Sequence, residues 1–229
     1  MPLSGRGWTV PIGIFNREDL EVNAFVRRSA APRATENRCP PNLTRRYVRS
    51  MNPVFDIERS DDAPAIDSMI RRAFQEQLSV ADMVAAIRAS AQYEPGLTLV
   101  ARQADQVVGF VMISHAELVD AEGGRHDVLT LSPLAVHPDH ERHGIGSALV
   151  RAVLSLADAR SDLPRLVTLE GSPLFYGRLG FEFAPDHGVI FDLPDWAPPA
   201  AAQVHRLTGY DPAVRGRVTY PAAFALAEG

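Results

Sequence analysis

The chain has 229 residues, 46% of them apolar, which is enough to fill the core of one large domain. Its single cysteine, Cys39, excludes an internal disulfide framework and a cysteine-rich zinc site. All 23 basic residues are arginines, and nine of these lie in residues 1–50. The remainder holds 14 arginines against 24 acidic residues, a balance that argues against a broad surface for DNA or RNA phosphates.

The first 50 residues, which include "RRSAAPRATENRCPPNLTRRYVRS", have neither helical nor strand periodicity. We expect them to be disordered or a non-native extension, and residues 51–229 to form one domain with a C-terminal extension from about residue 196. No apolar run reaches the roughly 18 residues of a membrane span, and no secretory signal is recognisable. The single cysteine also fits a reducing compartment, so we expect a cytoplasmic protein without a membrane partner.

Regular patterns begin after Met51. Residues 53–60 alternate as in a strand, and Asp62 followed by Pro64 predicts the start of a helix. A shorter helix is expected over residues 79–91, followed by two strands within residues 97–118 that a turn near 104–106 joins.

The second half begins with a loop over residues 121–127 and a strand over 128–136. Apolar residues recur from Ile145 to Ala157 at the spacing of an amphipathic helix, and residues 165–171 predict a further strand. A short helix is expected over residues 172–179, and residues 181–185 and 188–193 are expected to form a final pair of strands. This order predicts a mixed α/β domain.

The segment "HPDHERHGIGSALV" at residues 137–150 has three histidines spaced three apart, which is compatible with metal ligands on one side of a helix. His137, His140 and His143 are the residues concerned. However, Pro138 disfavours a continuous helix through the first two, and no second histidine cluster or cysteine pair supplies further ligands. We therefore expect no metal site.

Two glycines, Gly144 and Gly146, stand where the apolar helix begins, directly after a strand and a turn. Backbone N–H groups are free at such a position and can bind a phosphate. The pattern is not a Walker loop, because no Gly-Lys-Ser/Thr follows, nor a dinucleotide fingerprint, because Leu149 replaces its third glycine. Taken alone, the two glycines are equally consistent with a structural tight turn.

The wider segment "LTLSPLAVHPDHERHGIGSALV" resembles the acyl-CoA-binding segment of the GNAT family, the Gcn5-related N-acetyltransferases. A second segment, "LEGSPLFYGRLGFEF", resembles the family's later Tyr-x-x-x-Gly-Phe motif, and the resemblance covers residues 51–195. Within the family the chain most resembles a branch of predicted acetyltransferases with undefined substrate. The resemblance implies a mixed, mostly antiparallel sheet of about six to seven strands with flanking helices, splayed between the fourth and fifth strands.

The resemblance also implies an acyltransferase that moves an acetyl group from acetyl-CoA to an amine of a small molecule or peptide, by direct attack on the thioester. The alternative is a non-catalytic acyl-CoA-binding regulatory protein. The residues implied to contact the cofactor through their backbone are Leu134, Ala135, Val136, Glu141, Arg142, His143, Gly144, Ile145, Gly146 and Ser147. Glu141 stands where the family has Gln or Arg, and its carboxylate is expected to weaken pyrophosphate binding.

For catalysis, Tyr176 matches the family's tyrosine, which donates a proton to the departing thiolate. The N–H of Leu134 or Ala135 is expected to stabilise the oxyanion. The candidates for the general base are Glu117, His115 and Glu170, and the residues leave this choice open. The identity of the acceptor and the oligomeric state are also open, with a homodimer as one option.

Overall fold

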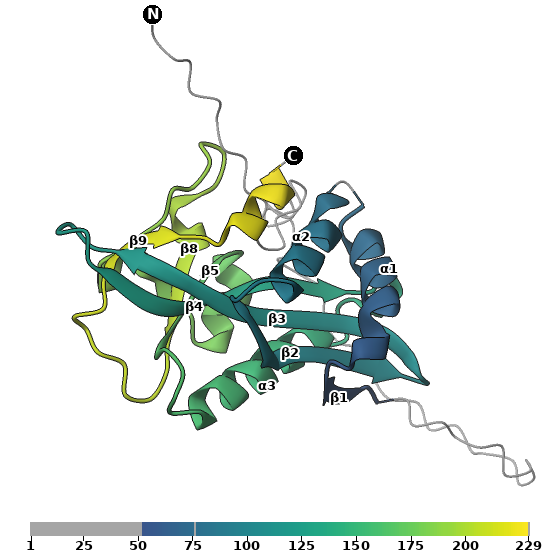
Figure 1. The fold of residues 1–229 in the computed structure, drawn as a ribbon. Coiled ribbons are helices and arrows are strands. Elements are labelled where there is room, and N and C mark those ends of the chain that lie inside the picture. Colours follow the sequence, from purple (N-terminus) through teal and green to yellow (C-terminus); the bar gives the residue numbers. More distant parts are fainter. Residues whose placement is uncertain (1–51, 76, 229) are drawn as a thin grey trace, which may run out of the picture.

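The computed structural model describes residues 52–75 and 77–228, so the expected N-terminal extension lies outside the described residues (Figure 1). The helices are α1 (Ala63–Ala73), α2 (Ser79–Arg88), α3 (Ile145–Ala159) and α4 (Pro173–Tyr176). The strands are β1 (Val54–Ile57), β2 (Tyr93–Gln103), β3 (Gln106–Val119), β4 (Arg125–Val136), β5 (Leu166–Glu170), β6 (Glu182–Phe183), β7 (Val189–Ile190), β8 (Ala202–Arg206) and β9 (Gly216–Thr219). None of the helices in these ranges is long and apolar enough to cross a membrane.

One sheet contains all of these strands, in the order β1-β2-β3-β4-β5-β8-β6, with β9 paired to β3 and β7 paired to β9. The pairs β4–β5 and β7–β9 are parallel, and the other pairs are antiparallel. The prediction of a mixed, mostly antiparallel α/β fold is therefore confirmed. The sheet has nine strands rather than six to seven, because the C-terminal segments "AQVHR" and "GRVT" join it as β8 and β9.

The predicted turn between the two central strands is confirmed at Ala104 and Asp105, whose φ angles are 49° and 68°. Two adjacent residues with positive φ give a tight turn whose twist matches that of a hairpin. The strand expected over 128–136 begins three residues earlier, at Arg125, because its pairing with β3 continues as far as Val119.

The prediction that residues 181–185 and 188–193 pair with each other is wrong. Between them lies a 3₁₀ turn, Ala184–His187, which ends at Gly188 with a φ of 69° and redirects the chain. As a result, β6 pairs with β8, whereas β7 pairs with β9. Each of these strands has only two residues, which is too few for sequence alternation to specify a partner.

Hydrophobic cores lie on both faces of the sheet. On one face α3 packs through Leu149 and Val153 against residues of β2, β3 and β4. On the other face α1 and α2 pack together with Phe224, which belongs to a 3₁₀ helix at Ala222–Glu228. Figure 1 shows this C-terminal helix in yellow beside α2, with α3 across the sheet. The sheet is thus the middle layer, and the chain's last described segment covers part of one face.

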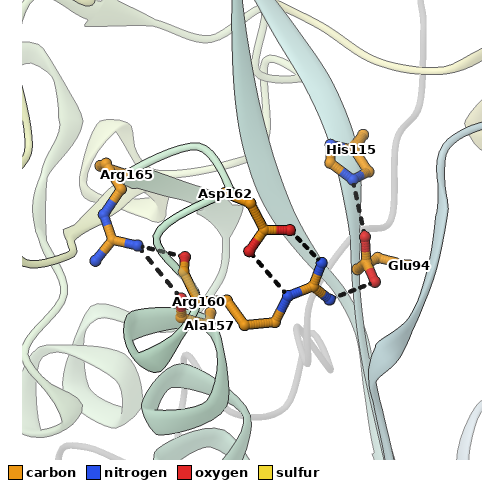
Figure 2. A network of polar contacts seen from close by, with 6 residues as sticks. All are labelled: Glu94, His115, Ala157, Arg160, Asp162 and Arg165. Atoms are coloured by element: carbon orange, nitrogen blue, oxygen red, sulfur yellow. Dashed lines mark hydrogen bonds and ion pairs between the residues drawn. The ribbon is translucent and has the colours of Figure 1, made fainter.

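Polar contacts fix the C-terminal end of α3 (Figure 2). Arg165 donates to the backbone oxygens of Ala157 and Arg160 at 3.5 and 2.8 Å, in addition to the backbone N–H groups of Arg160 and Leu163 that these two oxygens accept. The Arg160 side chain in turn bonds Glu94 of β2 at 2.7 Å and Asp162 at 2.6 Å. This end of α3 is anchored to the sheet, so its N-terminal end has a defined position.

Gly109 of β3 lies where α3 crosses the sheet. A Cβ at this position would stand 2.9 Å from Ile145 Cγ2 and 2.9 Å from Leu149 Cδ1, distances that would force these side chains or the helix to shift. The close approach of α3 to the sheet therefore requires glycine here.

Replacing Gly109 with Ala is expected to lower the free energy of unfolding by about 1–3 kcal/mol, because it overpacks a closed interface. Chemical denaturation measures this change. Gly177→Ala is the matched control, because a Cβ at Gly177 meets no atom within 4 Å. Equal stability of the two variants would show that α3 adjusts freely.

Candidate cofactor and catalytic site

The parallel strands β4 and β5 run together for only two pairs, Leu129 with Val167 and Thr130 with Thr168. The Thr168 hydroxyl also donates to the Leu129 oxygen at 3.1 Å, and the Thr130 hydroxyl donates to the Thr168 oxygen at 3.4 Å. These bonds strengthen the two-pair contact, which we call the β4–β5 joint. Beyond it β4 continues to Val136, and within the described residues no strand pairs with its free edge. The predicted splay between the fourth and fifth strands is confirmed.

A β-bulge lies in β4 at the start of the splay. Along β3 the register advances by two residues, from Val111 to Ile113, whereas along β4 it advances by three, from Leu134 to Leu131. Both of these leucines belong to the core under α3, so Ser132 and Pro133 between them turn toward the opposite face. Bulges of this kind redirect backbone groups and are frequent at active sites.

The loop after β4 leads into α3 through a left-handed turn. Arg142 has a φ of 58° and Gly144, the N-cap of α3, has a φ of 81°. The first bond of the α3 ladder runs from the Ala148 N–H to the Gly144 oxygen at 3.0 Å, so the preceding N–H groups of the first turn have no partner inside the helix. Glu141, Arg142, His143 and Gly144 are exposed, and the helix dipole favours an anion at this end.

The two sequence motifs meet at Gly146. A Cβ built on Gly146 would lie 3.5 Å from Val136 and 3.6 Å from both Leu134 and Phe175. The first turn of α3, the free end of β4 and the short helix α4 therefore converge on one point. The predicted cofactor-contacting residues Leu134 to Val136 and Ile145 to Ser147 are brought together here, beside Tyr176 of the second motif.

Tyr176 is 1% exposed and belongs to the core under α3. Its ring packs edge-on against Phe175 and Phe181, with centroid distances of 4.8 and 5.5 Å. Gly171 makes room for the ring, because a Cβ there would stand 2.7 Å from Tyr176 Cδ2 and closer still to Cε2. Burial raises the pKa of Tyr176 above its ordinary value, so the phenol holds its proton at neutral pH and gives it up only to a strong base such as a thiolate.

Glu170 is the last residue of β5 and is 4% exposed. It lies at the splay, and its Oε1 accepts a hydrogen bond of 2.8 Å from the phenol of Tyr220. Sequence patterns indicated Glu170 but gave no sign of Tyr220, because nothing in "RVTYPAAF" indicates a contact 50 residues earlier in the chain. They also gave no sign of Ser132, whose buried hydroxyl finds no hydrogen-bond partner among the described residues.

The other two candidates for the base lie away from the splay. Glu117 pairs in register with Asp127, two residues before the β4–β5 joint, and forms an ion pair with Arg125. His115 lies 3.4 Å from Glu94, which bonds Arg160 after the C-terminal end of α3 (Figure 2). The structure therefore brings Glu170, and neither Glu117 nor His115, to the end of the splay that holds Tyr176.

The histidines of residues 137–143 have local contacts. The rings of His137 and His140 meet edge-on at 5.6 Å, and His137 Nδ1 accepts from the Asp139 N–H at 3.2 Å. His143 is exposed. In the part of the chain that the structure describes, no group of three or more His, Cys, Asp or Glu side chains is placed to hold a metal ion.

Comparison with known proteins identifies the class to which this fold and site belong. The model of the "Acetyltransferase (GNAT) family" matches residues 63–181, just over half of the chain. The chain belongs to the GNAT family.

Among individual relatives, the chain is 32% identical to the "Uncharacterized N-acetyltransferase YhbS" of Escherichia coli K12 over 160 residues, which span 70% of this chain and 89% of YhbS. The crystal structure of E. coli YhbS in complex with CoA matches with a TM-score of 0.63 and 31% identity, covering 76% of this chain and 93% of that one. A GNAT family acetyltransferase from Brucella melitensis in complex with acetyl-CoA matches with a TM-score of 0.60 and 26% identity, covering 76% and 99%.

The chain turns at Gly144 with a positive φ of 81°. Gly144→Ala is expected to lower the free energy of unfolding by about 1 kcal/mol, because a Cβ is unfavourable at positive φ even though no atom lies within 4 Å of it. Gly144→Asn should lose less, since Asn tolerates this conformation. Thermal unfolding compares the two variants, and equal losses would contradict a backbone origin.

Proposed function

We propose that this chain is an N-acetyltransferase that transfers the acetyl group of acetyl-CoA to an amine by direct attack on the thioester. The observation that carries the proposal is the divergence of β4 from β5 beside the first turn of α3 and the buried Tyr176. Family membership and the CoA and acetyl-CoA complexes of two structural relatives support it.

The donor is expected to occupy the splay. The pantetheine arm contains amide groups, and the unpaired edge of Leu134 to Val136 offers backbone groups that it can pair with as a strand would. The pyrophosphate would bind the N–H groups of the α3 first turn. Glu141 is exposed and adds negative charge to this loop, whereas Arg142 beside it adds positive charge.

Donor and acceptor reach the reaction centre from opposite faces of the sheet in this proposal. Tyr176 belongs to the core on the α3 face. Leu169 belongs to the same core, so alternation along β5 turns its neighbour Glu170 to the opposite face. The thioester would lie between them, with its carbonyl oxygen near the backbone N–H of Leu134 or Ala135 at the bulge.

The chemical step then uses both groups. Glu170 takes a proton from the acceptor ammonium, directly or through water, and the neutral nitrogen forms a bond to the thioester carbon. The C–S bond breaks, and the thiolate takes the proton of the Tyr176 phenol. The attacking nitrogen, cationic once the bond has formed, loses its second proton to solvent as the amide forms. The proton on Glu170 also passes to solvent, and Tyr176 is reprotonated from solvent, so the products are an amide, CoA and one proton.

An assay for free thiol, with acetyl-CoA and a panel of aminoglycosides, polyamines, amino acids and peptides, tests this function. Amine-dependent thiol release is the expected result. Stabilisation of the protein by acetyl-CoA without any turnover would instead favour a regulatory acyl-CoA-binding protein. A small-molecule or peptide acceptor, residence in the cytoplasm and a homodimer stay predictions.

Gly146→Ala is expected to weaken acetyl-CoA binding about tenfold, a free-energy change of about 1.4 kcal/mol, because the methyl group would occupy the point where β4, α3 and α4 converge. Its stability should stay near that of the wild type, since the new Cβ would make only ordinary contacts of 3.5–3.6 Å. Titration calorimetry measures the affinity. If Gly146→Ala bound acetyl-CoA with wild-type affinity, the donor would bind elsewhere.

Tyr176→Phe is expected to lower kcat about 100-fold, the scale of a lost general acid, while acetyl-CoA affinity stays near that of the wild type. Steady-state kinetics and calorimetry separate the two effects. Loss of affinity with unchanged turnover per bound donor would show that Tyr176 has a binding role instead.

A further inference from the structure

The chain's C-terminal segment supplies a partner to the proposed base. Tyr220, whose phenol bonds Glu170 at 2.8 Å, lies outside residues 63–181, which the family model matches. The contact therefore adds to the proposed site a group from beyond the matched region.

The residues before and after Tyr220 in the chain both fix its position. Directly before it, β9 pairs with β3, with Thr219 opposite Glu117. After it, Phe224 stacks on the Tyr220 ring with a centroid distance of 5.0 Å and an interplanar angle of 13°. Phe224 is itself 1% exposed and packs in the core that contains α2. The phenol consequently has a fixed position from which to donate to Glu170.

Buried hydroxyls accompany this carboxylate on the same face of the sheet. Ser132 lies two residues beyond Thr130 on β4, as Glu170 lies two residues beyond Thr168 on β5, and Ser114 of β3 pairs in register with Thr130. Both serines are at least 99% buried, and neither Oγ has a hydrogen-bond partner among the described residues. Buried polar groups without partners are costly, so these two hydroxyls are free to bond a polar group that reaches this position.

The surroundings of Glu170 come from several elements. The titratable group that faces it from the C-terminal segment is Tyr220, while β8 places Ala202 opposite it in register and β4 contributes Ser132. Arg88 of α2, a cation on the same face, is paired with Glu58 at 2.6 Å.

We propose that Tyr220 is a positioning residue of the acceptor site, which holds the Glu170 carboxylate at the splay, where together with the Ser132 hydroxyl it receives a cationic primary amine. This inference rests on the proposed function and deepens it. The C-terminal segment, Gly216–Glu228, is then a wall of the acceptor site as well as a part of the core.

The test is the pH profile of kcat, which reports groups in the enzyme–substrate complex. A phenol that donates to a carboxylate favours its ionised form and lowers its pKa, so Tyr220→Phe should raise the pKa of Glu170. The acid limb of the profile should move about one pH unit to higher pH, because a hydrogen bond to a charged group contributes more stabilising free energy than one between neutral groups. Spermidine, histamine and glycinamide serve as probe amines.

Tyr210→Phe is the matched control, because the Tyr210 phenol donates to the Val214 oxygen at 3.2 Å and does not contact Glu170. Its acid limb should stay at the wild-type position. The inference would be overturned if the acid limb of Tyr220→Phe stayed at the wild-type position, or if the acid limb of Tyr210→Phe shifted by the same amount as that of Tyr220→Phe. A wild-type protein that acetylates none of the probes and does not bind acetyl-CoA would refute the proposed function instead.

A direct measurement needs no acceptor. The carbon-13 carboxyl signal of Glu170, assigned by its loss in Glu170→Gln, should titrate at higher pH in Tyr220→Phe than in the wild type and in Tyr210→Phe. If Tyr220→Phe does not fold, Glu170→Gln still tests the base that Tyr220 is proposed to position, because it should abolish the acid limb and lower kcat. A Glu170→Gln enzyme with a wild-type profile would overturn the proposal.

Discussion

The site depends on the short parallel pairing between β4 and β5, which consists of two residue pairs, Leu129 with Val167 and Thr130 with Thr168. Beyond Thr130 and Thr168 the strands part, and no strand in the described part of the chain pairs with the backbone N–H and C=O groups on the free edge of β4. Unpaired backbone groups in a protein interior are unfavourable, so this edge is ready to pair with a ligand that carries amides of its own. The threonine hydroxyls at the joint fix where the opening begins.

The surrounding elements maintain this opening. Arg165 and Arg160 fix the C-terminal end of α3, and Gly109 lets the helix lie close to β3, so the first turn of α3 stands at the mouth of the splay. Phe175 of α4 approaches the same point from the far side of the gap. The position of the first turn of α3 thus follows from contacts at both ends of the helix.

Local patterns in the sequence were sufficient for much of this arrangement. The turn at Ala104 and Asp105, the start of α1 after Asp62 and the apolar face of α3 all follow from residues close together in the chain, and the structure has them where the pattern places them, although the Asp62 side chain does not cap α1. The pairing of β6 and β7 was mispredicted, because two-residue strands contain too little alternation to specify a partner. Tyr220 was missed for another reason: its contact with Glu170 depends on the pairing of β9 with β3, which joins segments about 100 residues apart.

The choice among the three candidate bases shows what the fold adds to the sequence. Glu117, His115 and Glu170 all lie on strands, and their residue types do not distinguish them. Their positions in the sheet do distinguish them. Glu117 lies before the β4–β5 joint, and His115 belongs to the polar network near the C-terminal end of α3. Of the three, Glu170 is the one that lies where β4 and β5 diverge.

The placement of Tyr176 and Glu170 on opposite faces of the sheet has a consequence for the order of events in the proposed reaction. Each substrate would have an entrance of its own, so a bound donor would not obstruct the acceptor's path, and both would be held at once in a ternary complex. Neither Tyr176 nor Glu170 needs to carry the acetyl group in between, and the CoA product would leave on the side from which the donor came. In such an enzyme the sheet separates the routes by which the two substrates enter and leave. The substrates would meet where β4 and β5 diverge.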